Sequence, residues 1–233
     1  MKPFINNHDD IMEFLDDRVA SVKWDKFYGE RKFQTPFILQ KTMPDENLVE
    51  FLSKGISIKS AAELGCGEGR NAIYMAKNNI SVTAFDISST AIENAINIAK
   101  DGGVAVDFRC YDVIKDKLSG EYDFVYDSGL LHHLPPHRRI TYLELLQAIL
   151  KPSGYYGLTC FAWGENVANE VDDWGFYEQK YSAGVAFTKE RLIELFTPYF
   201  DVIEIRKYKN QVPDTIQGLQ FMWACLFKDK RTE

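Results

Sequence analysis

Three glycines at alternate positions, Gly65, Gly67 and Gly69, stand between a short apolar run and a segment with helical spacing. The run before them ends at Leu64, and the helical pattern after them begins at Arg70. Alternating glycines at a strand-to-helix junction predict a backbone that turns tightly and lies against a ligand. The helix beyond such a turn presents unpaired N–H groups and the positive end of its dipole. The stretch therefore predicts a pocket for a nucleotide-like ligand.

Strand-like and helix-like segments alternate along the chain from this region onward, which predicts an α/β sheet. The last two predicted strands are joined by a stretch with no helical pattern, so we expect them to pair antiparallel. These segments predict a doubly wound sheet, parallel except at its end, with the pocket at the carboxyl ends of the strands. The expected strands are 58–64, 81–86, 104–110, 122–126, 155–161, 201–208 and 220–227, and the expected helices are 70–78, 89–100, one opening at Pro135 and 188–196.

No linker divides the 233 residues, so we predict a single domain over 1–233. It begins with a helical N-terminal lid segment (1–53), followed by the ligand-binding core (54–161). An insert (162–186) comes next. The chain ends in a helix and an antiparallel strand pair (187–233).

Composition limits the class of partner and the compartment. The net charge is −7, and no run of Lys and Arg exceeds two residues, which makes a nucleic-acid substrate unlikely. The four cysteines are far apart, and we expect Cys110, Cys160 and Cys225 to lie buried in strands as small apolar residues. No apolar run has the length of a signal peptide core or a membrane span. The expectation is a reduced, cytoplasmic protein without membrane attachment, and its oligomeric state stays open.

A dinucleotide-binding dehydrogenase, such as a nicotinamide oxidoreductase, is the alternative for this pocket and is disfavoured. That fingerprint requires a glycine at the sixth position counted from Gly65, and Arg70 stands there. Asp86 closes the next predicted strand about twenty residues later, where a carboxylate can bind both hydroxyls of a ribose.

At this point the chain resembles the class I S-adenosylmethionine-dependent methyltransferases. The resemblance covers 56–161 closely and 188–228 in pattern. It implies a seven-stranded sheet of order 3-2-1-4-5-7-6, in which the inserted last strand is antiparallel, and S-adenosylmethionine as the cofactor. The motifs that carry it, in the order of that family, are Glu63–Gly69, Asp86–Ser88, Asp112–Val113, Tyr122–Asp127 and Lys151–Gly154.

The resemblance assigns the glycine stretch to the methionine part of the cofactor. It implies that Gly65 and Gly67 allow close approach of the backbone and that Glu63 stands at the acidic position beside it. Cys66 and Asn71 lie in the same stretch and are counted as candidate cofactor contacts, although a packing role is the alternative for Cys66.

The later motifs correspond to the nucleoside. The resemblance implies that Asp86 binds the ribose, with Ile87 beside the adenine and Ser88 adjacent in the same motif. It further implies that Asp112 reaches the adenine amino group and that Val113 lies against the ring.

The acceptor side is predicted from the residues that follow the fourth strand. Asp127 ends this strand, where the resemblance implies that sulfonium and acceptor meet. His132 and His133 are the candidate catalytic residues, because a histidine with an ordinary pKa suits a general base. A positioning or packing role is the alternative for each. Adjacent histidines rarely converge on one ion and no acid or cysteine stands at ligand spacing, so we predict no metal.

Two further segments are expected to cover the pocket. Trp24 and Tyr28 of the N-terminal segment are predicted to reach the cofactor. Together with the residues after Asp127, they resemble the thiopurine/thiol and tellurite-resistance-like branch of small-molecule methyltransferases. The insert 162–186 is the expected acceptor lid, although its aromatic residues could instead fasten the loop to the sheet. These residues are Trp163, Trp174, Phe176, Tyr177 and Tyr181.

The sequence therefore predicts methyl transfer from S-adenosylmethionine to a small molecule, with release of S-adenosylhomocysteine. A thiol or another soft nucleophile is one class of acceptor. A protein or RNA methyltransferase and a non-catalytic S-adenosylmethionine-binding protein are the alternatives.

Overall fold

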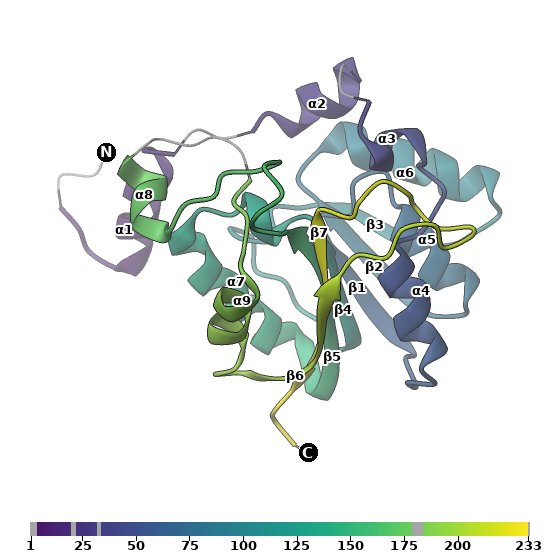
Figure 1. Ribbon diagram of the computed structural model, residues 1–233. Helices are drawn as coiled ribbons and strands as arrows, with labels where there is room; N and C mark the ends of the chain where they lie inside the picture. Colours follow the sequence, from purple (N-terminus) through teal and green to yellow (C-terminus); the bar gives the residue numbers. More distant parts are fainter. Residues whose placement is uncertain (1–3, 20–21, 32–33, 179–183, 233) are drawn as a thin grey trace.

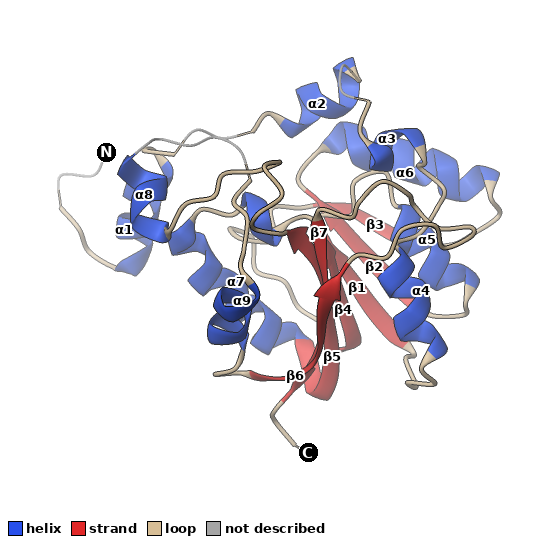
Figure 2. Ribbon diagram, viewed as in Figure 1, coloured by secondary structure: helices blue, strands red, loops and turns tan. Residues whose placement is uncertain are grey.

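A seven-stranded sheet forms the centre of the molecule, with strand order β3-β2-β1-β4-β5-β7-β6 (Figure 1 and Figure 2). The computed structural model describes residues 4–19, 22–31, 34–178 and 184–232. Pairing is parallel from β3 to β5, whereas β7 is antiparallel to both β5 and β6. The predicted fold class and strand order are confirmed. The strands are β1 (Ser60–Leu64), β2 (Ser81–Asp86), β3 (Asp107–Cys110), β4 (Tyr122–Ser128), β5 (Leu150–Phe161), β6 (Phe200–Lys207) and β7 (Met222–Asp229).

Helices cover both faces of the sheet because successive strand residues point to opposite sides. In β4, Phe124 and Tyr126 join one apolar cluster, while Val125 between them joins the other. One face is covered by α4 (Glu46–Ser53), α5 (Arg70–Lys77) and α6 (Ser89–Asp101). The other is covered by α7 (Pro136–Ile149) and α9 (Lys189–Phe196) (Figure 1).

The helix α6 shows how local sequence defines an element. Its buried residues Ala91, Ile92, Ala95 and Ala99 recur at helical spacing and face the sheet. The hydroxyl of Ser88 accepts a hydrogen bond from the N–H of Ala91 and so caps the first turn.

Short helices from both halves of the chain lie outside these two layers. The N-terminal segment contains α1 (His8–Asp16), α2 (Trp24–Glu30) and α3 (Pro36–Leu39) before it reaches α4. The insert contains α8 (Asp173–Glu178), which lies beside α1 in Figure 1. Tyr181 of the insert lies outside the described residues.

Two expectations are corrected at the edge of the sheet. The edge strand β3 begins at Asp107 rather than at 104, and Cys110 is exposed, whereas Cys66, Cys160 and Cys225 are buried. As an edge strand, β3 has only β2 as a neighbour. Its side chains can therefore stay exposed to solvent even where the sequence is apolar. No helix in the described part of the chain has the length and apolar character to cross a membrane.

Candidate active site

A cavity of about 790 Å³ lies at the carboxyl ends of the central strands, within the usual size of a small-molecule site. Its walls come from the turns after β1, β2, β3 and β4, from the N-terminal segment and from the start of β7. Most of the predicted cofactor residues line it: Trp24, Tyr28, Glu63, Gly65, Cys66, Gly67, Asn71, Asp86, Ile87, Asp112 and Val113. The structure therefore brings together motifs that are spread over ninety residues of sequence.

The glycine turn is held in an unusual backbone conformation. Gly65, Gly67 and Gly69 have φ angles of 70°, 54° and 81°, in the left-handed region that favours glycine. A Cβ atom on Gly69 would stand 2.7 Å from the ring of Phe108. Gly65 and Gly67 thus present backbone, and no side chain, to the cavity, whereas Gly69 lies against Phe108.

Asp86 fastens this turn from the adjacent strand. One carboxylate oxygen accepts a hydrogen bond from the N–H of Gly67 at 2.8 Å, and the other accepts from Ser88 at 2.9 Å. Burial raises the pKa of Asp86 above its ordinary value, although both N–H groups oppose this shift. Asp86 therefore links the glycine turn to the end of β2 while lining the cavity.

Glu63 binds the first turn of α5. Its carboxyl group accepts from the N–H of Ala72 at 2.8 Å and from the side-chain amide of Asn71 at 3.2 Å. Complete burial raises the pKa of Glu63 to about 8. At neutral pH this group is therefore largely protonated and brings little negative charge to the cavity.

Ile87 is half exposed and, like Asp112 and Val113, lines the cavity. The Asp112 carboxylate accepts from the N–H of Ile114 at 3.1 Å, which fixes its orientation. Ser88 does not line the cavity. Instead it caps α6 and donates to Asp25 of α2 at 2.8 Å, so it anchors the N-terminal segment.

The two candidate histidines lie in a short 3-10 turn (Leu131–His133) between β4 and α7, and both line the cavity. The ring of His132 stacks on Phe161 with centroids 3.9 Å apart, and His133 packs edge-on against Trp24 at 4.8 Å. Nδ1 of each ring has no hydrogen-bond partner among the described residues. Burial lowers the pKa of His132 and lowers that of His133 to about 4. The expectation of an ordinary histidine pKa is therefore wrong, and both rings are neutral at pH 7.

Asp127 lies beneath the histidine turn and does not line the cavity. Its carboxylate accepts from the N–H groups of Leu130 (2.6 Å) and Leu131 (3.0 Å) and from the hydroxyl of Tyr142 (2.7 Å). Burial raises its pKa to about 6. These contacts give Asp127 a positioning role for the turn that carries the histidines.

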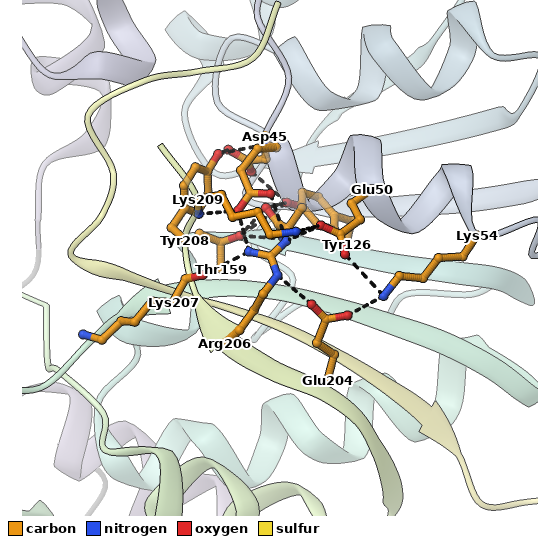
Figure 3. A network of polar contacts seen from close by, with 12 residues as sticks. Asp45, Glu50, Lys54, Tyr126, Thr159, Glu204, Arg206, Lys207, Tyr208 and Lys209 are labelled. Carbon is orange, nitrogen blue, oxygen red and sulfur yellow. Dashed lines mark hydrogen bonds and ion pairs between the residues drawn. The ribbon is translucent and has the colours of Figure 1, made fainter. Parts of the chain in front are cut away.

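A buried network that the sequence did not reveal centres on Asp45 (Figure 3). This fully buried carboxylate is 2.8 Å from the guanidinium of Arg70 and accepts from the hydroxyls of Ser128 (2.6 Å), Tyr126 (2.8 Å) and Tyr208 (3.0 Å). Arg70, which the sequence used only to exclude a dinucleotide, thus lines the cavity and connects α5 to β4. The local sequence places Asp45 just before α4 but gives no sign that it is a buried residue of the site. On the outer side the network continues to Arg206, which pairs with Glu46, Glu50 and Glu204, and to Lys54 and Lys209 (Figure 3).

Both outer segments are attached to the start of α7. Arg138 pairs with Asp16 of α1 at 2.6 Å, while Arg139 pairs with Asp173 of α8 at 2.6 Å. His137 bridges the two segments, with ring nitrogens 3.0 Å from Asp16 and 2.7 Å from the hydroxyl of Tyr177.

The insert reaches the cavity through Val167 and Phe176 rather than through its tryptophans. Trp174 is 79% exposed and Trp163 is 37% exposed, and neither lines the cavity. The described residues contain no group of three metal-binding side chains.

Comparison with known proteins assigns the domain. Residues 61–154 match the family model described as "Methyltransferase domain". The chain is 28% identical over 109 residues to the ubiquinone biosynthesis O-methyltransferase of Coxiella burnetii, which covers 46% of this chain and 46% of the relative. It is also 28% identical over 93 residues to Hemagglutinin 1 of Eikenella corrodens, covering 40% of this chain and 31% of that protein. The match thus spans less than half the length of these curated relatives.

Among solved structures, the 1,6-didemethyltoxoflavin-N1-methyltransferase of Burkholderia thailandensis aligns with a TM-score of 0.65 at 17% identity. That alignment covers 98% of this chain and 92% of the other, and at this identity it shows the fold alone. Residues 61–154 therefore match a methyltransferase domain, and the sheet has the strand order that the resemblance to the class I methyltransferases implies.

Proposed function

We propose that this protein transfers a methyl group from S-adenosylmethionine to a small-molecule acceptor and releases S-adenosylhomocysteine. The observation that carries the proposal is the shared cavity of the glycine turn, Asp86 and Asp112, with the histidine turn at its other side. Carboxylates at the ends of β2 and β3 suit a ribose and an adenine amino group, as in the nucleoside sites of doubly wound folds.

The residues fit such a cofactor in shape as well as in charge. Gly65 and Gly67 present bare backbone to the methionine part, while Ile87 and Val113 offer apolar surface to a flat base. Trp24 and Tyr28 close this part of the cavity from α2. Phe161, which stacks on His132, lines the cavity together with Phe221 and Phe37, and these aromatic rings suit an organic acceptor of modest size.

The compared proteins support a small acceptor without fixing the accepting atom. The relative from Coxiella burnetii is named as an O-methyltransferase, and the Burkholderia thailandensis protein as an N1-methyltransferase with bound S-adenosylhomocysteine. A thiol or another soft nucleophile remains our proposal for this chain. We place it in the reducing cytoplasm, because all four cysteines are free.

Thermal unfolding with S-adenosylhomocysteine tests the cofactor assignment. A ligand present at a hundred times its dissociation constant adds about 2.7 kcal/mol to the free energy of unfolding, so the midpoint should rise by several degrees. NAD at the same concentration is the control and should leave the midpoint unchanged. A rise with NAD, or none with S-adenosylhomocysteine, contradicts the proposal.

A further inference from the structure

Lys41 lines the cavity and has no ion pair with any residue that the structure describes. Among the described residues, four lysines and arginines line the cavity, and three of them pair with carboxylates of this chain. Arg70 lies 2.8 Å from Asp45, and Asp16 takes both Arg138 at 2.6 Å and Lys115 at 3.5 Å. Lys41 is the fourth, and its ammonium has no hydrogen bond or ion pair within the described ranges.

Lys41 belongs to the wall on the acceptor side. The neighbouring Gln40 exchanges two hydrogen bonds with Gln217, at 2.9 and 3.3 Å, and the carbonyl of Pro44 accepts from Ile216 at 2.9 Å. Residues 40–44 therefore run along 216–217, and the chain beyond supplies three apolar residues of the cavity wall: Leu219, Phe221 and Met222. The carboxylates assigned to the nucleoside, Asp86 and Asp112, lie at the ends of β2 and β3 instead.

The histidines that face the same space lack the support of a general base. In the Ser-His-Asp arrangement, a buried carboxylate orients the imidazole and stabilises its protonated form. Here His132 contacts Phe161 and His133 contacts Trp24, and no carboxylate of the described residues bonds to either ring. Burial without a counter-charge lowers both pKa values, so neither ring holds a proton well near pH 7.

We propose that the acceptor is bound as an anion, such as a thiolate or an acidic phenolate, with Lys41 as its counter-charge and with neither histidine removing a proton. This inference rests on the proposed function. A lone pair of the anion forms the new bond to the methyl carbon, the carbon–sulfur bond breaks, and its electron pair stays on the sulfur. One sulfonium and one anion thus become two uncharged centres, and no proton leaves in the step.

The surroundings of Lys41 favour an ion pair between its ammonium and an anionic acceptor. Arg70 is paired with Asp45, whereas Lys115 and Arg138 share the one carboxylate of Asp16. The other acidic side chains that line the cavity are Asp17, Glu63, Glu68, Asp86 and Asp112. Leu219, Phe221 and Met222 give the cavity wall apolar surface, and a lower local dielectric strengthens the attraction between an ammonium and an anion.

A matched pair of phenols tests the proposal through binding. 4-Nitrophenol and phenol share the accepting oxygen, but phenol, with a pKa near 10 like that of tyrosine, stays neutral at pH 7.5 whereas 4-nitrophenol is largely ionised. The visible absorbance of 4-nitrophenolate reports its ionisation directly. Titrated with the enzyme saturated with S-adenosylhomocysteine, bound 4-nitrophenol should show a pKa lowered by roughly 1 unit or more, because an opposite charge lies close by.

Lys41→Met should abolish this shift and weaken 4-nitrophenolate binding at least tenfold, while phenol binding changes little. Lys100→Met, on the exposed side of α6, is the control and should behave as the unmodified protein. With S-adenosylmethionine present, the rate against pH should follow the ionisation of 4-nitrophenol, and His133→Gln should leave the position of that inflection unchanged.

The possible outcomes distinguish the anionic acceptor from the methyltransferase function on which it rests. An unshifted 4-nitrophenol, equal preference for phenol, or no binding of either to an enzyme that does bind S-adenosylhomocysteine overturns the anionic acceptor and leaves the methyltransferase proposal standing. Loss of S-adenosylhomocysteine binding in Lys41→Met assigns the ammonium to the methionine carboxylate and likewise overturns it. An unmodified protein that binds no S-adenosylhomocysteine contradicts both.

Discussion

The hydroxyl of Tyr28 occupies the place that a side chain on Gly67 would need, since a Cβ atom built there stands 2.6 Å from its oxygen. Helix α2 therefore rests directly on the glycine turn. The position of α2 over the turn and the absence of a side chain at position 67 are parts of one arrangement.

Gly67→Ala should abolish stabilisation by S-adenosylhomocysteine, because the new methyl group displaces Tyr28 and the left-handed backbone becomes strained by about 1–2 kcal/mol. Gly55→Ala is a matched control: Gly55 has a φ of 73°, but a Cβ there meets nothing within 4 Å. It should lose similar stability and keep the ligand response in a thermal shift measurement.

A double variant separates the clash from the strain. Tyr28→Phe removes the oxygen and leaves the ring carbon Cζ 3.4 Å from the added methyl. Gly67→Ala combined with Tyr28→Phe should therefore bind S-adenosylhomocysteine more tightly than Gly67→Ala alone. Simple additivity of the two changes would show that the contact does not matter.

Asp86→Asn should weaken S-adenosylhomocysteine binding by tenfold or more. An amide can place an acceptor against only one of the N–H groups of Gly67 and Ser88, and hydrogen bonds to a charged group contribute about 1.5–3 kcal/mol. Isothermal titration calorimetry measures the change, with Asp201→Asn on the exposed edge strand as the control. Unaltered affinity would remove Asp86 from the ribose site.

Glu63 should make the protein less stable as pH rises. Its folded pKa, about 8, lies above the unfolded value near 4.3, so the folded state holds the proton more firmly. Its contribution is complete below about pH 4 and is lost between there and pH 8, with a slope approaching about 1.4 kcal/mol per pH unit. Denaturant unfolding from pH 5 to 8 should show a flatter dependence for Glu63→Gln, and no flattening for the exposed Glu190→Gln.

Asp16→Asn should loosen α1 without unfolding the domain. The change removes the ion pairs of Asp16 with Arg138 and Lys115, and such partly exposed pairs are worth up to about 1 kcal/mol. Trypsin should then cut after the exposed Arg18 about fivefold faster, since cleavage follows the open population. Glu13→Gln on the same helix should cut at the original rate, and equal rates for both variants would argue against the attachment.

Much of the fold follows from local patterns. The strand β2 has the predicted bounds, 81–86. Its apolar residues indicate the strand, and the acid Asp86 indicates where it ends. The strand order followed from the family resemblance. Buried strands and glycine turns have clear sequence patterns. The edge strand β3 has a weaker pattern, and it was predicted too long.

The roles of the site residues were harder to predict from the sequence, because they depend on contacts with residues that are distant in the chain. The position of Asp127 near the end of β4 predicts a cavity residue, yet both of its carboxylate oxygens accept hydrogen bonds from the turn that follows. Trp174 is aromatic but faces solvent, and the pKa of His133 depends on the burial that the whole fold creates. Sequence spacing places such residues at one edge of a sheet, but the direction of each side chain is set by packing.

The contacts of Asp45 also determine the order in which this protein can be completed during synthesis. Tyr208, which donates to Asp45, lies 163 residues later in the chain, and β6 joins the sheet only through β7, the last strand. A nascent chain that has emerged as far as β5 holds the whole glycine turn, yet it lacks the residues that complete the wall beside Lys41. Such long-range closure is slow, so the cofactor half can be ready on the ribosome while the acceptor half waits for the end of translation.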